Sequence, residues 1–427
     1  MAQSSLTAPA TLPTLKPSAV TPASRETAEV AMTTAELIRI VLQNNPALIA
    51  SQRGREAAAA AVTSAEALPN PRVDMSTGNN RARLLSATGG PVGGWGVSQL
   101  IENPSVREAR ISGARFAERG SFQQVAVTTN ELVALVRLRA FEYLLRKEEA
   151  SAAADALALL EQIRTRVRIR FESGEAARYE VIKANAEIIN AQQKLQSARL
   201  LIDQAALTIN RLAAGHLPSR WTLTGKLEDS GLVTGLEAAK QSALLNNPEL
   251  KALQAALDRQ EARVSEARAS RWPGVELRYN QFRDPEIRQN LLSVNVQIPL
   301  LDQRTGPQKE ASAEAVRARV LLEGRREDLN QQVLFAWKAI EIARVRVTGL
   351  SKGSIPEAEA ALRVAEAAYR FGERGILDVL DAQRLLRSVN ADLLDARYQL
   401  QAANVELDLL SGRYADLNGN SAINLLP

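Results

Sequence analysis

Long stretches of the chain space their apolar residues three and four positions apart, as an amphipathic helix does. No proline interrupts residues 105–171, nor residues 308–355 before Pro356, where we expect a kink or a break. At 1.5 Å per residue, the first stretch would form a helix about 100 Å long. In the segment 175–214 the apolar spacing is heptad-like, as in Ile189, Leu195, Leu200, Ile202, Ile209 and Leu212. The pattern therefore predicts long coiled-coil helices that pack side by side.

Two short regions show a different pattern, in which apolar and polar residues alternate. Every second residue is apolar in 275–279 and in 292–298. Strict alternation predicts β-strands with one apolar and one polar face. The first half of the chain has weaker, glycine-rich counterparts. We therefore expect four strands, arranged as one β-hairpin at 71–101 and a second at 273–300.

The chain contains the same succession of features twice. Asn-Asn-Pro at 44–46 returns at 246–248, and a Pro-x-Val-acid phrase that begins at Pro71 returns at Pro273 with the same offset. Two anchors at one constant offset indicate an internal repeat, which has to be recognised before the fold is assigned.

Each long helical stretch ends in a similar phrase of Arg-Phe, then glycine, then an acidic residue followed by valine. A glycine after a helix supplies the left-handed turn that lets the chain reverse. We therefore predict two antiparallel helical hairpins with tips at 170–175 and 370–375. The helix that begins each repeat (the opening helix) could stack end to end on the helix that leaves the tip (the returning arm). Together they would match one long helix in length.

These features divide the chain into two repeats of helix, β-hairpin, long helix, tip and helix. The repeats cover 33–220 and 221–415, between a flexible arm at 1–32 and a short tail at 416–427. The expected fold class is mainly α with a small β part. The start of the sequence lacks the basic and apolar segments of a signal peptide, so we expect that such a peptide has been removed.

Composition and charge exclude several functions. The chain is 45% hydrophobic but only 4% aromatic, which suits closely packed long helices rather than one thick core. The formal net charge is +5, but Lys and Arg alternate with Asp and Glu as on solvated helix faces, so we expect no nucleic-acid partner. With no cysteine and a single histidine, His216, we expect no metal site and no cofactor. The sequence contains no phosphate-binding loop and no nucleophile elbow, so no motif indicates an enzyme.

Four strands cannot close a barrel within one chain, and two interpretations remain open. The strands could form a small sheet in a soluble coiled-coil scaffold or adaptor, or several chains could combine their strands into one membrane barrel. Alternation over strands of about 9–11 residues favours the barrel. Trp95, Trp272, Tyr279 and Phe282 lie at or near the expected strand ends, where an aromatic girdle would sit.

The segment 369–383, YRFGERGILDVLDAQ, carries a resemblance to a known family. Together with the two repeats, it resembles the TolC family of outer-membrane efflux proteins, and the resemblance covers 33–415. It implies a homotrimer whose twelve strands form one outer-membrane β-barrel and whose helices form a periplasmic α-helical barrel. The implied partners are a periplasmic adaptor (membrane fusion protein), an inner-membrane RND pump and outer-membrane lipid. The implied location is the outer membrane, extending into the periplasm.

The resemblance also implies roles for five residues near the tips. Tyr369 and Arg374 match the residues that hold the family's tunnel entrance shut, and Glu180 stands where their acidic partner is expected. Asp378 and Asp381 match an acidic ring that lines the constriction. Their spacing places both carboxylates on one helix face, although acids just after a glycine turn also stabilise a helix start without any pore. Without the resemblance, Glu180 and Arg374 would be interpreted as surface ion pairs.

The tips would dock the adaptor, and the residues implied are Arg170, Phe171, Gly174, Arg370, Phe371 and Gly372. The phrases at 170–176 and 102–105 are most similar to the CzcC-type branch, which exports heavy metals through RND systems. We therefore expect a passive export duct for heavy-metal cations. A multidrug or other small-molecule duct of the same family is the alternative, and a soluble scaffold is a further one.

Overall fold

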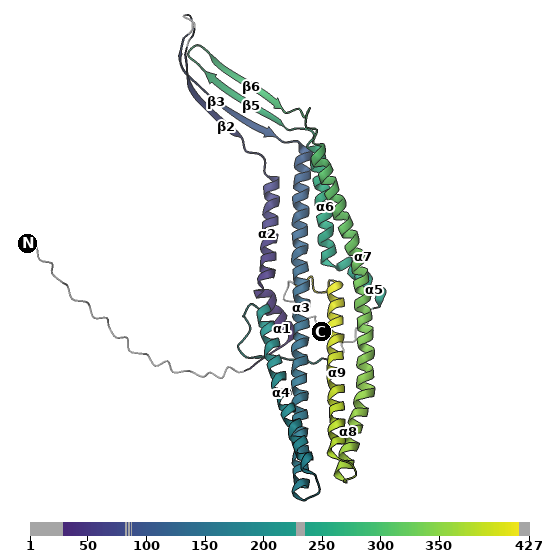
Figure 1. Ribbon diagram of the computed structural model, residues 1–427. Helices are drawn as coiled ribbons and strands as arrows, with labels where there is room; N and C mark the ends of the chain where they lie inside the picture. Colours follow the sequence, from purple (N-terminus) through teal and green to yellow (C-terminus); the bar gives the residue numbers. More distant parts are fainter. Residues whose placement is uncertain (1–28, 82, 84–85, 87, 228–234, 418–427) are drawn as a thin grey trace, which may run out of the picture.

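The computed structural model describes residues 29–81, 83, 86, 88–227 and 235–417. Within them the chain is mainly helical, with a small sheet at one end of a long helical layer (Figure 1). The expected fold class, mainly α with a small β part, is therefore confirmed. Most of the predicted arm and tail lies outside the described residues.

The elements follow one another in the same order in both halves of the chain. The first half contains β1 (Val30–Met32), α1 (Thr34–Asn44), α2 (Pro46–Glu66), β2 (Arg72–Asn80), β3 (Gly90–Ile101), α3 (Pro104–Glu172) and α4 (Arg178–Leu212). The second half contains β4 (Trp221–Leu223), α5 (Leu236–Asn246), α6 (Pro248–Ala269), β5 (Val275–Arg283), β6 (Arg288–Val296), α7 (Thr305–Gly349), α8 (Ile355–Arg370) and α9 (Ile376–Leu410). The halves differ between α7 and α8, where Leu350–Ser354 form a π-helical turn.

The π-helical turn lies where the sequence predicts a break. Pro356 is in the first turn of α8, directly after this turn. Proline has no N–H to donate and its ring crowds the preceding turn, so a regular α-helix cannot continue through it. The counterpart α3 has no proline beyond its first turn and continues for 69 residues, about 100 Å.

The helices form columns of similar height. The short helix α2 continues the direction of α4, and α6 continues that of α9, while α3 and the α7–α8 pair each span the full length (Figure 1). Helix α3 packs against α2, α4, α6 and α9, and α7 packs against α6 and α9. Opening helices thus stack end to end on returning arms, as their lengths predict.

The repeated Asn-Asn-Pro phrase forms the joint between stacked helices. The Oδ1 atom of Asn247 accepts hydrogen bonds from the backbone N–H groups of Glu249 (2.9 Å) and Leu250 (3.1 Å). Its Nδ2 donates to the carbonyl of Leu410, the last residue of α9, at 3.0 Å. Asn45 does the same, since it caps α2 and donates to the Leu212 carbonyl at 2.9 Å. One side chain therefore satisfies the start of one helix and the end of another.

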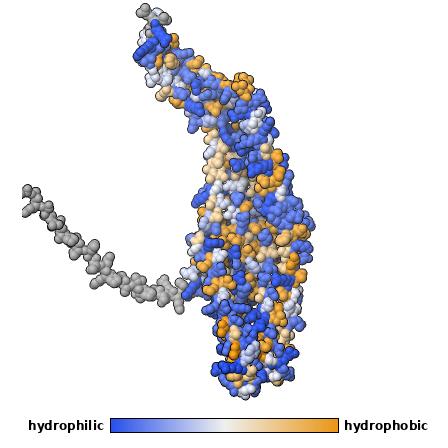
Figure 2. Space-filling view, in the orientation of Figure 1, coloured by the Kyte–Doolittle hydropathy of each residue, from blue (hydrophilic) through white to orange (hydrophobic). Residues whose placement is uncertain are grey.

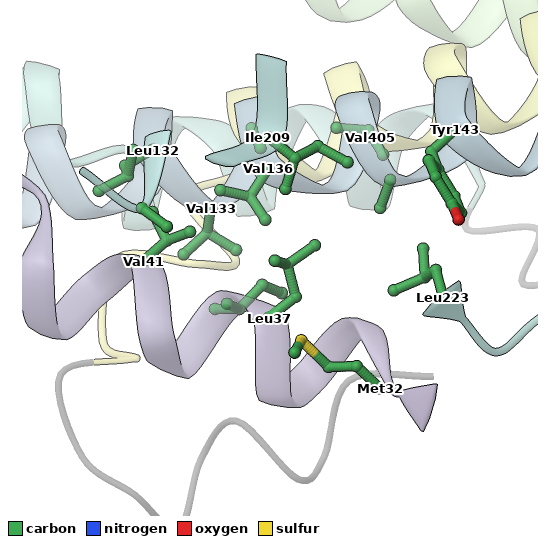
Figure 3. Close-up of a cluster of buried hydrophobic side chains, with 14 of the residues drawn as sticks. Met32, Leu37, Val41, Leu132, Val133, Val136, Tyr143, Ile209, Leu223 and Val405 are labelled. Atoms are coloured by element: carbon green, nitrogen blue, oxygen red, sulfur yellow. The ribbon is translucent and has the colours of Figure 1, made fainter. Parts of the chain in front are cut away.

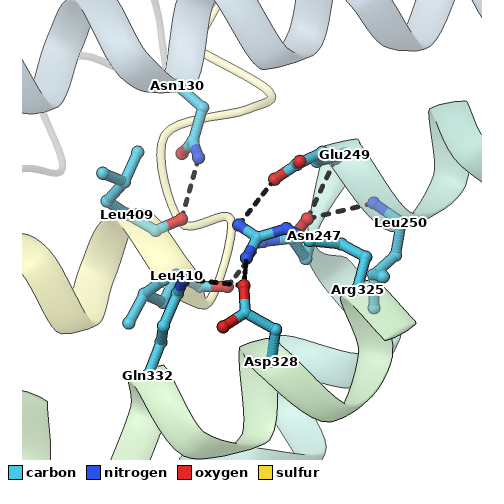
Figure 4. Close-up of polar contacts among 9 residues, drawn as sticks. All are labelled: Asn130, Asn247, Glu249, Leu250, Arg325, Asp328, Gln332, Leu409 and Leu410. Atoms are coloured by element: carbon cyan, nitrogen blue, oxygen red, sulfur yellow. Dashed lines mark hydrogen bonds and ion pairs between the residues drawn. The ribbon is translucent and has the colours of Figure 1, made fainter. Parts of the chain in front are cut away.

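Further polar contacts surround the joint at Asn247 (Figure 4). Arg325 of α7 pairs with Glu249 at 2.7 Å and with Asp328 on its own helix. The hydrogen bond to Glu249 is the main reason that the pKa of Arg325 is raised. Asn130 of α3 donates to the Leu409 carbonyl at 2.8 Å. Three columns therefore meet at one hydrogen-bonded junction.

A hydrophobic core surrounds the corresponding joint of the first half (Figure 3). Its buried residues include Met32, Leu37, Val41, Leu132, Val133, Val136, Tyr143, Ile209, Leu223 and Val405. Strands β1 and β4 pair in parallel beside this core. The sequence pattern does not predict this small second sheet, and β1 lies within the expected flexible arm. Trp221 stacks on Tyr143 with ring centroids 5.1 Å apart, which fixes β4 on α3.

The four predicted strands form an antiparallel sheet in the order β2-β3-β5-β6. The register aligns Val73, Val97, Tyr279 and Leu292 in one row, so their side chains share one face. The neighbouring rows on this face add Met75, Trp95, Leu277, Val294 and Val296. The other face carries Asp74, Ser98, Glu276 and Arg278, and Arg278 lies 3.6 Å from Glu276 and 3.9 Å from Asp74.

The expected placement of four aromatic residues at or near strand ends is wrong for Trp95 and Tyr279. Trp95 and Tyr279 lie in the middle of their strands and contact each other, with ring centroids 5.6 Å apart. Phe282 lies next to Gly94 on the opposite face. Trp272 precedes β5 and is exposed. None of the helices within the described residues has both the length and the apolarity needed to cross a membrane.

We predict that Asn247→Ala destabilises the joint between α6 and α9 by about 2 kcal/mol, because it removes a helix cap and leaves the buried Leu410 carbonyl without its donor. Hydrogen exchange of the amides in the first turn of α6 should accelerate more than tenfold. Asn246→Ala is the matched control, because that side chain donates to Ser242 within its own helix. Equal exchange rates in the two variants would contradict the joint.

Candidate functional site

The two tips lie together at the end of the helical layer opposite the sheet (Figure 1). Each turns through a glycine with positive φ, 82° at Gly174 and 75° at Gly372, where any other residue would be strained. Each also closes with the same backbone hydrogen bond, from Glu175 to the Arg170 carbonyl (2.8 Å) and from Glu373 to the Ala368 carbonyl (2.9 Å). The predicted tips are therefore built as one repeated turn.

The repeated turn aligns the two tips differently from the sequence letters. When Gly174 is matched to Gly372, Arg170 corresponds to Ala368 and Phe171 corresponds to Tyr369. The alignment of the two Arg-Phe phrases is therefore wrong by two residues. The letters Arg-Phe begin four residues before the turn glycine in the first tip and two residues before it in the second, so they occupy different helical positions.

Tyr369 lies buried between the tips. The guanidinium of Arg170 lies over its ring, 4.8 Å from the centroid, and Arg170 Nη1 donates to the Tyr369 carbonyl at 2.9 Å. The Tyr369 hydroxyl and Glu180 Oε2 are both buried and, among the residues that the structure describes, neither has a hydrogen-bond partner. Glu180 lies near enough to raise the pKa of the Tyr369 phenol, so two of the three predicted gate residues are brought together, although neither oxygen atom has a hydrogen-bond partner in the described chain.

The surroundings of Tyr369 favour its neutral form. Burial is the main reason that the pKa of Tyr369 is raised, and the nearby Glu180 carboxylate raises this pKa further. The phenol therefore stays neutral at physiological pH. The neutral phenol contributes fully to the stability of the fold below pH ~10, the ordinary pKa of tyrosine. This contribution is lost as the pH rises beyond that value, because the buried phenol must then ionise.

The third predicted gate residue, Arg374, points elsewhere within this chain. It forms a long ion pair with Asp378 at 3.8 Å, and about two thirds of its side chain is exposed. The single chain therefore does not join Arg374 to Glu180. The carboxylate of Asp378 in the first turn of α9 also suits the positive end of the helix dipole.

The second predicted ring residue, Asp381, belongs to an ion-pair cluster that the sequence analysis missed. Arg384 Nη1 donates to Asp381 at 2.9 Å, and Arg384 Nη2 contacts Glu187 of α4. The hydrogen bond to Glu187 is the main reason that the pKa of Arg384 is raised. Glu187 is buried. Its place between Ala184 and Ala191 on the buried side of a heptad pattern was the available signal, because a charge at such a position needs a partner.

The residues expected to dock an adaptor divide into two groups. Phe371 is 78% exposed and Phe171 is 41% exposed, and Arg370 is exposed beside Phe371. Arg170 instead turns inward onto the second tip. Of the residues expected to dock an adaptor, Phe171, Phe371 and Arg370 are thus presented to solvent. Within the described residues, no group of three or more His, Asp or Glu side chains is placed to hold a metal ion.

A family model described as "Outer membrane efflux protein" matches residues 37–215 and 239–413. The chain belongs to the outer membrane efflux protein family. The two matched segments contain both tips and all five residues predicted to form the gate and the acidic ring. Members of this family are outer-membrane efflux channels.

Two curated relatives are similar to most of this chain. The cobalt-zinc-cadmium resistance protein CzcC of Cupriavidus metallidurans is 26% identical, over 82% of this chain and 83% of that protein. The outer membrane protein TolC of Vibrio cholerae is 26% identical, over 85% of this chain and 87% of that protein. The predicted resemblance to the TolC family and its CzcC-type members is confirmed.

Two solved structures have the same fold. The outer-membrane channel OprN superposes with a TM-score of 0.77 at 16% identity, over 89% of each chain. The open state of the MtrE outer membrane channel of Neisseria gonorrhoeae superposes with a TM-score of 0.72 at 21% identity, over 89% of this chain and 88% of that one.

We predict that Glu180→Gln lowers the pKa of Tyr369, because the substitution removes a negative charge that opposes ionisation of the phenol. Phenolate absorbance during an alkaline titration reports this change, and the Tyr369→Phe variant identifies which step belongs to Tyr369. Glu172→Gln, which alters a mostly exposed carboxylate that pairs with Arg168 on the first tip, is the matched control. An unchanged Tyr369 step in Glu180→Gln would contradict the contact.

Proposed function

We propose that three copies of this chain form an outer-membrane duct that passively conducts heavy-metal cations from a periplasmic adaptor and an RND pump to the outside. One observation carries the proposal. Within the described residues, the sheet is apolar on one face and polar on the other, and its outer strands β2 and β6 each have a strand neighbour on one side only. Such a sheet is incomplete in a single chain.

The strand directions allow closure between copies. All three pairings are antiparallel, so β2 and β6 run in opposite directions, and β6 of one copy could pair with β2 of the next. Three copies would supply twelve strands, an even number, as an antiparallel barrel requires. The apolar face would contact outer-membrane lipid, and the face with Asp74, Ser98 and Arg278 would line an aqueous lumen. Figure 2 shows apolar side chains at the surface of the sheet and of the helical layer.

The helices also carry apolar stripes that no part of the described chain covers. Ile182, Ile189, Leu200 and Leu207 of α4 are exposed, and they lie within about 20° of one another around the helix. The opposite side of α4 carries the buried residues Ile188 and Ala191. Helix α7 likewise exposes Phe335, Ile342 and Val345. Two apolar stripes on helices of opposite halves suit a ring in which α4 of one copy packs against α7 of the next.

The substrate class rests on chemistry at the tips and on one relative. Asp378 and Asp381 lie on one face of α9, and three copies would place six carboxylates around the entrance. A carboxylate ring favours cations over anions. The similar protein CzcC is named for resistance to cobalt, zinc and cadmium. A passive duct needs no metal site of its own, because selection would take place in the pump.

The gate of this duct would combine contacts within and between copies. Within one chain, Glu180 lies near enough to Tyr369 to raise the pKa of its phenol. Arg374 is largely exposed and has only a long ion pair in the described chain, so its guanidinium can reach a neighbouring copy. We propose that this contact closes the entrance, and that the exposed Phe171 and Phe371 receive the adaptor.

We predict that the detergent-extracted protein has the mass of a trimer and that Ile189→Glu converts it to monomers, because the charge would fall in the seam between copies. Ile189 is 64% exposed in the single chain, so the substitution should leave the circular dichroism of the helices unchanged. The matched control is Gln192→Glu, about 60° away around the same helix. A parent protein that is monomeric, with no gain of strand signal in detergent, would contradict the proposal.

We predict that Arg374→Ser increases the resting conductance of the trimer in planar bilayers, because the entrance loses a closing contact. Arg363→Ser is the matched control, since Arg363 pairs with Glu359 on the surface of α8. Equal conductance of Arg374→Ser and the parent would remove Arg374 from the gate.

We predict that replacing Asp378 and Asp381 together with asparagine lowers the preference for cations over anions, measured as a shift of the reversal potential in a salt gradient. In cells that lack their own duct, the parent should restore tolerance to cobalt, zinc or cadmium. Tolerance to organic toxicants without tolerance to metals would instead assign the duct to small-molecule export.

A further inference from the structure

We infer that Arg170 is a gating residue that fastens the two helical hairpins of one copy to each other at the entrance. The inference rests on the proposed function, because such a contact matters for transport only where the tips close a channel. Arg170 and Tyr369, which we call the tip clamp, come from different halves of the chain. Arg170 was expected to dock an adaptor, and its inward orientation gives it a different role.

The guanidinium of Arg170 makes two different contacts with Tyr369, one with the ring and one with the backbone carbonyl. Its Cζ atom lies over the Tyr369 ring, 4.8 Å from the centroid, and its Nη1 atom donates to the carbonyl of the same residue at 2.9 Å. A cation over an aromatic face and a charged hydrogen bond are both favourable, and both depend on direction. Hydrophobic contacts tolerate sliding, whereas this pair fixes the position of the second hairpin relative to the first.

The neighbouring residues hold Arg170 in this orientation. Glu175 Oε2 lies 3.5 Å from Arg170 Nε and restrains the side chain from its own tip. On the second tip, a Cβ atom at Gly372 would lie 3.7 Å from Arg170 Nη2. The guanidinium therefore lies against the backbone of the reversed turn that Gly372 provides.

The clamp has a defined place among the contacts between the hairpins. Above it lies a buried seam that includes Leu160, Ile163, Val167, Leu362, Ala365, Val379 and Leu380. Arg384 and Glu187 join α9 to α4 further from the apex. Arg170 therefore acts at the apex end of the seam, where the hairpins would first separate. The clamp is one-sided, because Ala368 occupies the position in the second tip that corresponds to Arg170.

The test is the resting conductance of full-length trimers in planar bilayers. Arg170→Ala should raise the conductance several-fold over the parent, and Arg170→Lys should give an intermediate value, since lysine keeps a cation over the ring but loses the planar fork. Arg168→Ala is the matched control on the same turn, because Arg168 pairs with Glu172 at the surface. Its conductance should equal that of the parent.

A second pair of variants asks whether Arg170 acts through Tyr369. Tyr369→Leu removes the ring and should also raise the conductance. The conductance of the double variant Arg170→Ala with Tyr369→Leu should be close to that of the more conductive single variant. Its fold-change over the parent should therefore be well below the product of the two single fold-changes. Independent, multiplying effects would overturn the clamp, because they would show that each residue acts alone.

Folding and gating failures are separated by trimer mass and by the temperature at which the trimer dissociates. A trimeric, conducting parent whose Arg170→Ala variant has unchanged conductance overturns the inference and leaves the proposed function standing. A parent that neither trimerises nor conducts overturns the proposed function, and the inference with it. Where Arg170→Ala fails to trimerise, Arg170→Lys and Tyr369→Leu decide, and parental conductance in both overturns the clamp.

Discussion

The whole structure depends on one side-chain type that joins helix ends. Asn45, Asn103 and Asn247 each precede a proline, cap the helix that follows and donate an amide hydrogen to the end of another helix. A helix leaves four N–H and four C=O groups unsatisfied at its ends. Two short helices can therefore replace one long helix only where those groups are satisfied. Asn45 and Asn247 satisfy these groups at the joints within columns, and Asn103 joins the start of α3 to the end of the neighbouring helix α6. Columns of nearly equal height follow from the two joints.

A layer of equal columns has consequences for the surface of the chain. Helix α4 has apolar residues on two opposite sides, and only one side packs within the described chain. The sheet similarly has one apolar face and two outer strands without a second neighbour among the described residues. Both features would be unfavourable in a soluble monomer. They become favourable together if copies associate around an axis, because the same association covers the stripes and closes the sheet.

The sequence was sufficient to predict those features that repeat a local rule. Helical spacing, strand alternation and the Asn-Asn-Pro offset predicted the columns, the four-stranded sheet and the end-to-end stacking. The small β1–β4 sheet was missed because three-residue strands such as Val30–Met32 carry no period. The placement of Trp95 and Tyr279 at strand ends was wrong because alternation alone does not show where a strand begins and ends. The Arg384–Glu187 pair was missed because it joins residues 197 positions apart, and no local pattern connects them.

The tips show why matching letters can mislead in an internal repeat. The two Arg-Phe phrases differ in helical phase, because the turn glycine follows them after different numbers of residues. A shift of two residues on a helix turns a side chain through about 200°. Arg370 therefore faces solvent while Arg170 faces the opposite tip. The backbone turns of the two tips are the same, but their side chains differ. The contact between the tips therefore comes from Arg170 of the first tip and has no counterpart from the second. Because this contact is separate from the hydrogen bonds that close the turns, it can break without unfolding either turn, as the opening of a gate requires.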